Sequence, residues 1–105
     1  MNIIFHPEVM SVDLPRIEQE MNDASAFAEF MMCVDRAIIE MAKRPVDNGA
    51  PLLFPPLQDY RKKKFHSKLK PHKNISADMR LIYRCDCDRG EILIGAIWVI
   101  MSSLP

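Results

Sequence analysis

A dense run of basic side chains, with histidines between them, is the part of this chain that could do chemistry. Seven of the fourteen lysines and arginines lie between Arg61 and Lys73. Residues 60–105 carry a formal charge of +6 and residues 1–59 carry −6, so the neutral whole chain is strongly dipolar. Local potential rather than net charge steers association with a polyanion. The charge pattern therefore predicts a surface for nucleic acid.

The basic run alternates with a period of two. Between Tyr60 and Lys70, every even position after Tyr60 carries a basic side chain or a histidine: Lys62, Lys64, His66, Lys68 and Lys70. In a strand, alternate side chains share one face, so a strand over this segment would place all of them together. The segment Ala77–Cys85 alternates in the same way and carries Arg80 and Arg84 on its polar face. A two-strand basic patch is therefore predicted.

This patch has a structural alternative, because lysines on an edge strand also discourage sheet-to-sheet aggregation. However, like charges side by side across a sheet destabilise it, on the scale of about 0.2–1 kcal/mol per pair. Crowding of this kind favours an anionic ligand. Contacts between these side chains and phosphates would make the affinity fall as salt rises.

His66 lies within the stripe and is able to exchange a proton near neutral pH. It could act as general acid or base in RNA cleavage, while Lys or Arg stabilises the pentacoordinate phosphate. A surface histidine without a catalytic task is the alternative.

Three cysteines, Cys33, Cys85 and Cys87, form an odd set that favours reduced thiols over a disulfide framework. Cys85 and Cys87 would share one face of a strand. With His66 or His72 they could bind a soft metal, but a single Cys-x-Cys pair is a weak zinc signal. Small buried thiols are the alternative. We expect neither a metal nor a cofactor.

The periodicity of the apolar residues predicts the elements that must position these side chains. Apolar residues at positions 27, 30, 31, 34, 38 and 41 share one face of a helix. Asp13 suits an N-cap and Pro15 a first helical turn. Residues 44–59 contain four prolines and are expected to form a long irregular connection. The predicted elements are a strand over 2–6, helices over 14–21 and 25–43, and strands over 60–70, 77–85 and 92–101.

This order predicts a single α+β domain over residues 1–105. Consecutive strands form an antiparallel meander, and the helices cover one of its faces. Trp98 is expected to be a core aromatic residue. No apolar stretch reaches the length of about 18 residues that suggests a membrane span. The first residues lack the features of a signal peptide, so we expect a cytoplasmic protein with no membrane partner.

The stretches Pro56–Phe65 and Ser76–Arg84 together resemble the RelE/ParE superfamily of type II toxin–antitoxin toxins. In that family a basic strand precedes a strand that reads roughly Asp-x-Arg-hydrophobic-hydrophobic-Tyr, as in the run from Asp78 to Tyr83 here. The predicted order of elements is similar to the family's fold along essentially the whole chain. The resemblance implies an α+β, RelE-like fold, in which an N-terminal strand and a helical hairpin pack on an antiparallel-rich sheet completed by a C-terminal three-strand meander.

The resemblance also implies an activity. RelE-like members cleave mRNA on the ribosome by driving the ribose 2′-OH onto the scissile phosphate, and a cognate antitoxin protein neutralises them. By position, Arg80 would stabilise the phosphate, with Lys62 and Lys64 as an electrostatic clamp. His66 would transfer the proton if the protein cleaves RNA. The other basic residues expected to bind RNA are Arg61, Lys68, Lys70, Lys73 and Arg84. No metal is required.

A non-catalytic protein on the same scaffold is the alternative. ParE-like members bind DNA gyrase, and a degenerate toxin would only bind a partner. RelE-like nucleases commonly carry an Arg, His or Tyr after the last strand, whereas residues 97–105 of this chain contain none. This departure favours the alternative, while the two-strand basic patch favours the nuclease.

Overall fold

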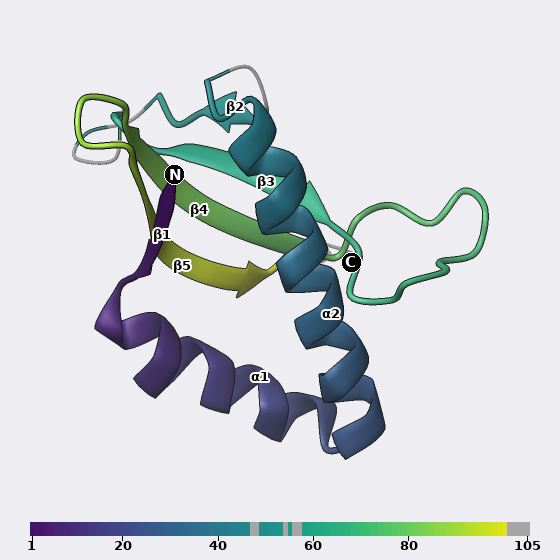
Figure 1. Cartoon of the computed structure of the whole chain (residues 1–105). Coiled ribbons are helices and arrows are strands. Elements are labelled where there is room, and N and C mark those ends of the chain that lie inside the picture. The colour runs from purple at the N-terminus through teal and green to yellow at the C-terminus, as the bar shows by residue number, and fades with distance from the viewer. Residues whose placement is uncertain (47–48, 54, 56–57, 101–105) are drawn as a thin grey trace.

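The computed structural model describes residues 1–46, 49–53, 55 and 58–100. Within these residues, two α-helices, a π-helical segment and a mixed sheet of five strands form an α+β fold (Figure 1). The helical elements are η1 (Val9–Asp13), α1 (Leu14–Met21) and α2 (Ala24–Lys43). The strands are β1 (Asn2–Phe5), β2 (Ala50–Pro51), β3 (Arg61–Phe65), β4 (Met79–Asp86) and β5 (Glu91–Val99).

The sheet contains the predicted meander. Its strand order is β1-β5-β4-β3-β2, and β3, β4 and β5 pair antiparallel with their neighbours in the chain. The N-terminal strand β1 joins the sheet on the far side of β5 and runs parallel to it. The two helices lie between β1 and β3 in the chain, so they form the connection from one edge of the sheet to the other. An antiparallel-rich sheet with an N-terminal strand is thus confirmed.

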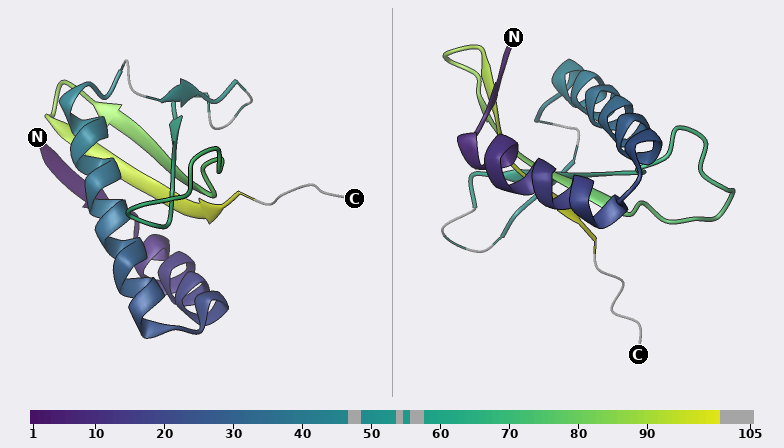
Figure 2. Two further views of the ribbon diagram at one scale, coloured as in Figure 1. Left: turned by 90° about the vertical axis from the view of Figure 1, so that its right-hand side faces the viewer. Right: turned by 90° about the horizontal axis from the view of Figure 1, so that it is seen from below.

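The helical hairpin is built by two polar residues in sequence. Asn22 ends α1 in the left-handed conformation that asparagine tolerates. The Asp23 carboxylate then caps α2 by accepting hydrogen bonds from the N–H groups of Ser25 and Ala26, at 2.9 and 3.1 Å. As a result, α1 packs beside the N-terminal half of α2 (Figure 2).

Among the described residues, no helix combines the length and the apolar character that crossing a bilayer requires.

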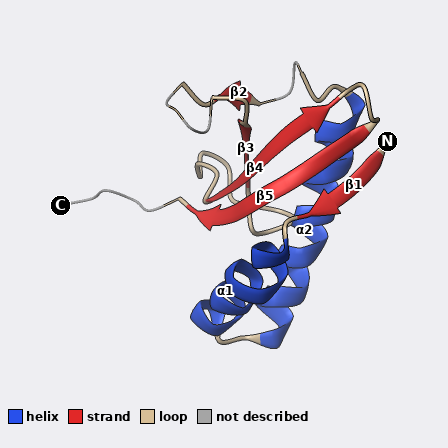
Figure 3. Ribbon diagram, turned by 90° about the vertical axis from the view of Figure 1, so that its left-hand side faces the viewer, coloured by secondary structure: helices blue, strands red, loops and turns tan. Residues whose placement is uncertain are grey.

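One face of the sheet packs on α2, and this contact forms the core. The rings of Phe30 in α2 and Phe65 in β3 stack with their centroids 6.3 Å apart. Buried residues of η1, α1, α2 and strands β3 to β5 belong to the same hydrophobic cluster. In Figure 3, β4 and β5 lie in front of α2, on the side from which their other face is seen.

The predicted strand over residues 60–70 was wrong at its C-terminal end, because β3 stops at Phe65. Beyond it, the N–H and hydroxyl of Ser67 donate to the Asp78 carboxylate at 2.8 and 2.6 Å. The Leu69 N–H donates to the Glu29 carboxylate of α2 at 2.9 Å. These side chains satisfy backbone groups that a strand ladder would otherwise use, and the chain turns away from the sheet.

The other predicted boundaries agree with the structure to within two residues wherever they are described. The helix over 14–21 is confirmed, and the second helix begins at Ala24 rather than at residue 25. The last strand is described as far as Val99, and its predicted end at Met101 lies outside the described residues. Among the described residues of the irregular connection over 44–59, the short strand β2 pairs with β3.

Asp13 has a different task from the helix cap that its sequence position suggested. It is the N-cap residue of α1 by position, but its side chain makes no capping hydrogen bond. Instead its buried carboxylate accepts the N–H of Ile97 in β5 at 3.0 Å. Strand β1 pairs with β5 only as far as Ile94, so Asp13 supplies an acceptor beyond the end of β1.

We predict that Asp13→Ala lowers the free energy of unfolding by about 1.5–3 kcal/mol, because the Ile97 N–H loses a charged acceptor in a buried place. Urea denaturation measures this difference. Arg16→Ala is the control, since Arg16 is half exposed and pairs with the same carboxylate at 3.3 Å. Its loss should cost under about 1 kcal/mol. Equal losses in the two variants would contradict the role of Asp13.

Candidate nucleic-acid interface

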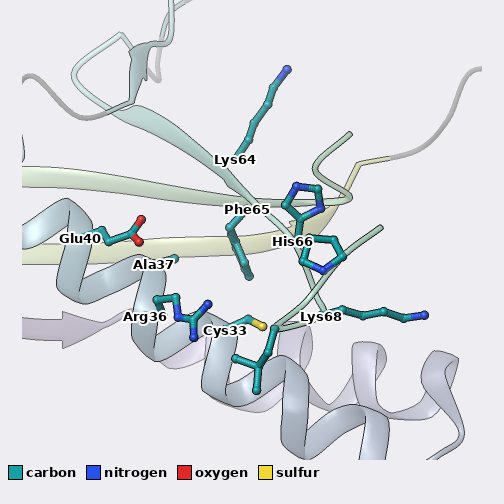
Figure 4. A pocket seen from close by; sticks show the side chains of 10 residues that line it. Cys33, Arg36, Ala37, Glu40, Lys64, Phe65, His66 and Lys68 are labelled. Carbon is teal, nitrogen blue, oxygen red and sulfur yellow. The ribbon is translucent and has the colours of Figure 1, made fainter. Parts of the chain in front are cut away.

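The side chains of β3 separate onto two faces. Phe65 is buried against Phe30, and the Lys63 ammonium lies 3.5 Å from the Glu40 carboxylate of α2. Odd-numbered residues of β3 therefore face α2. Because side chains alternate along a strand, Lys62 and Lys64 point to the opposite face. Figure 4 shows this directly, with the Phe65 ring directed toward α2 and Lys64 directed away from it.

The neighbouring strand β4 continues this pattern. Met79, Leu81 and Tyr83 belong to the core under α2, so the residues between them point the other way. In the register, Lys64 lies opposite Arg80 and Lys62 lies opposite Ile82. We call the face of the sheet that points away from α2 the outer face. Its members include Lys62, Lys64, Arg80, Ile82, Arg84, Ala96 and Trp98.

The predicted two-strand patch is thus present for Lys62, Lys64, Arg80 and Arg84. Among the described residues, no carboxylate lies within 4.0 Å of any of these four cations. Arg80 Nε is buried and has no hydrogen-bond partner among the described residues. Arg61 Nε, on the face toward α2, is buried in the same way, so the case for an anionic ligand rests on the grouping of the four cations and not on this atom.

Trp98 is an aromatic residue of this patch that the sequence analysis misplaced. It was expected in the core, yet its exposed fraction is 39%. The preceding residue, Ile97, points into the core, so Trp98 points to the outer face. There it lies opposite Arg80 in the register. Strand periodicity could have found this, but the run from residue 92 to 101 is apolar at nearly every position.

Tyr60 lies at the other end of the patch. The guanidinium carbon of Arg84 is 5.5 Å from the centroid of the Tyr60 ring, which is a cation–π distance. The pairing of β4 with β5 skips Gly95, since Ile82 pairs with Ala96 and Tyr83 with Ile94. A Cβ atom at Gly95 would lie 3.1 Å from the Tyr60 ring. Glycine at this bulge therefore lets the tyrosine approach the strand backbone.

Two apolar residues lie in the middle of the outer face, between Trp98 and Tyr60. Ile82 and Ala96 are paired in the register and are 2% and 8% exposed. Neither belongs to the core cluster under α2. The outer face therefore has buried apolar residues in its middle, with Lys62, Arg80 and Arg84 around them.

His66 lies just beyond β3, where two pockets meet. One pocket, of about 250 Å³, lies between α2 and residues 64–71 and includes Lys64, Lys68 and Arg36 (Figure 4). The second, of about 180 Å³, contains Ser67, His72 and Asp78 as well as His66. His66 and His72 thus line the same pocket. From the sequence, His72 was expected only as a possible metal ligand.

The remaining predicted RNA-binding residues are not on the outer face of β3. Lys68, Lys70 and Lys73 lie in the connection between β3 and β4, and all three are exposed. Arg61 lies in β3 but faces the other side, where its guanidinium donates to the Gly49 carbonyl at 2.9 Å. It also bonds Tyr83, whose hydroxyl donates to the Pro45 carbonyl at 2.8 Å. Burial raises the pKa of Tyr83, and Arg61 opposes this rise.

The two cysteines at the end of β4 lie as close together as their spacing predicts. Their sulfur atoms are 3.0 Å apart. They line a pocket of about 430 Å³ with Asp59, Asp86 and Asp88, so the basic patch is followed by an acidic region. Within the ranges that the structure describes, no three His, Cys, Asp or Glu side chains are placed to hold a metal ion. Neither His66 nor His72 joins the cysteine pair.

No match was found when the chain was compared with protein-family models, with curated proteins and with solved structures.

We predict that Cys85 is alkylated slowly at pH 8, because partial burial and the neighbouring Cys87 thiol raise its pKa to about 11. Its rate with iodoacetamide should rise roughly tenfold per pH unit up to that value, as the thiolate fraction does. Peptide mass spectrometry measures the rate. Cys87→Ser should speed the reaction at pH 8, since it removes one cause of the shift. A rate at Cys85 that does not depend on pH between 8 and 10 would contradict this prediction.

Proposed function

We propose that this protein is a RelE-like toxin that binds mRNA on the translating ribosome through the outer face and cleaves it. The observation that carries the proposal is the register pair of Lys64 and Arg80 on the outer face, with Lys62 and Arg84 beside it. These four cations have no described carboxylate within 4.0 Å, so they repel one another, and this cost is offset when they bind a polyanion. The resemblance of residues 56–65 and 76–84 to the RelE/ParE superfamily supports the same assignment.

The residues divide the chemistry between them in this proposal. Lys62 and Lys64 hold the phosphates, and the Arg80 guanidinium stabilises the negative charge that develops on the pentacoordinate phosphorus. The 2′-oxygen forms a bond to phosphorus while the bond to the 5′-oxygen breaks. This leaves a 2′,3′-cyclic phosphate and a 5′-hydroxyl.

Two proton transfers accompany this step, one from the 2′-hydroxyl and one to the leaving 5′-oxygen. His66 takes part in one of them as general base or general acid. His72 shares a pocket with His66, which supplies a second imidazole near the same place. No metal takes part in this scheme. A cognate antitoxin would neutralise the toxin.

The exposed lysines beyond β3 extend the same surface in this proposal. Lys68, Lys70 and Lys73 lie on the connection that leaves the patch, so they would contact phosphates farther along the RNA or on the ribosome. Arg61 has a structural role instead, because its contacts with Gly49 and Tyr83 tie β3 to the segment that follows α2.

We predict that Lys64→Ala combined with Arg80→Ala abolishes growth inhibition, because the double variant removes the central cations of the outer face. The measurement is colony formation after induction from a tightly repressed promoter. Circular dichroism should show a folded protein, since both side chains lie outside the core cluster. Lys43→Ala with Arg89→Ala is the matched control, because it removes the same charge from exposed sites away from the outer face. Retained toxicity in the folded Lys64/Arg80 variant would contradict the proposal.

The same cultures separate the proposal from the non-catalytic alternative. A ParE-like protein directed at DNA gyrase would arrest growth with intact mRNA and with broken or unrelaxed DNA. A degenerate toxin that only binds a partner would not arrest growth at all. Either result would replace the nuclease assignment.

A further inference from the structure

We propose that the outer face takes a single-stranded segment of RNA by stacking an unpaired base on Trp98, beside the phosphates that Lys64 and Arg80 hold. This inference rests on the proposed RNA-binding function and adds the form of the RNA and the residue that selects it. It concerns binding and holds whether or not the protein cleaves its ligand.

The placement of Trp98 relative to the cations is the first support. Arg80 pairs with Lys64 on one side and with Trp98 on the other, so these three residues form one row across β3, β4 and β5. Directly opposite residues on neighbouring strands share a face of the sheet. Strands lie about 4.8 Å apart, so the row spans roughly 10 Å. A phosphate on the two cations would therefore bring its own nucleotide or the next one beside the indole.

The availability of the Trp98 ring is the second support. Its exposed fraction is 39%, and β1 pairs with β5 only as far as Ile94, so β4 is the one described strand that flanks Trp98 and the indole is open to solvent. The ring pairs in the described part of the chain are Phe27 with Phe30 and Phe30 with Phe65, and the cation–π contact is Arg84 with Tyr60. Trp98 takes part in none of them. Tyr60, by contrast, already has a cation on its ring.

Stacking on an aromatic side chain selects for unpaired bases. In a duplex, neighbouring base pairs cover both faces of each base, whereas the bases of a single strand can turn out onto a protein surface. Exposed aromatic side chains within a basic surface are the usual means by which proteins bind single strands. A tryptophan at the surface also serves as an anchor in protein interfaces. The adjacent Lys64 and Arg80, which have no described carboxylate within 4.0 Å, favour phosphates over a protein partner here.

The chain contains one tryptophan, so its fluorescence reports on this position alone. The experiment titrates the full chain with a short single-stranded RNA whose 2′-hydroxyls are methylated to prevent cleavage, and with the same RNA annealed to its complement. We expect saturable quenching of the indole by the single strand and weaker binding of the duplex. This fluorescence measurement uses the wild-type protein and does not depend on the folding of any variant.

Variants then separate stacking from charge. Trp98→Leu should weaken binding of the single strand by roughly 5- to 150-fold, the range expected for one stacked base, and should leave the salt dependence unchanged. Arg80→Ala should weaken binding and also reduce the slope of log affinity against log salt by about 1. Met32→Ala is the control, because Met32 is an exposed apolar residue of α2, with 57% exposed, away from the outer face.

Each outcome separates this inference from the proposed function. Salt-dependent RNA binding without quenching, and with normal affinity in folded Trp98→Leu, would overturn the stacking inference and leave the RNA surface in place. Equal quenching by single strand and duplex would overturn the selection for unpaired bases. Absence of any RNA binding would overturn this inference, whereas the proposed action on the ribosome is decided by the growth-inhibition measurement with Lys64→Ala and Arg80→Ala.

Discussion

The packing of one face of the sheet against α2 is the constraint on which the rest of the structure depends. Phe65, Met79, Leu81 and Tyr83 turn toward the helix and are buried there. Because side chains alternate along a strand, every other residue of β3 and β4 must then turn to the opposite face. These residues are Lys62, Lys64, Arg80 and Arg84, together with Ile82. The core thus places the cations side by side, and a shift of one residue in either strand would bury them.

The strands that carry the cations are held in place by contacts that lie away from the outer face. Asp13 secures β5 through the Ile97 N–H, and Asp78 and Glu29 turn the chain at the end of β3. Arg61 and Tyr83 attach the other side of β3 to the segment after α2. Several polar side chains therefore have structural tasks, and they leave the outer face to residues that have no described ionic partner. This separation is what a preformed binding surface requires.

Much of this architecture could be predicted from the sequence, because the periods of its apolar residues are clear. The helix on positions 27 to 41, the meander and the pairing of a basic strand with Arg80 all follow from spacing. The strand predicted to Lys70 failed because side-chain acceptors far away in sequence, Glu29 and Asp78, compete for the backbone. Trp98 was misplaced since a strand apolar on both sides does not reveal which residues face the core. Arg61 shows the same limit, as charge alone does not tell which face a side chain takes.

The most direct test of the central claim is to map the 5′ ends of cellular mRNA before and after induction of the protein, with Arg80→Ala induced in parallel. A nuclease acting through the outer face predicts new 5′ ends within translated reading frames, present with the wild-type protein and absent with Arg80→Ala. Unchanged 5′ ends in cells that stop growing would contradict this account.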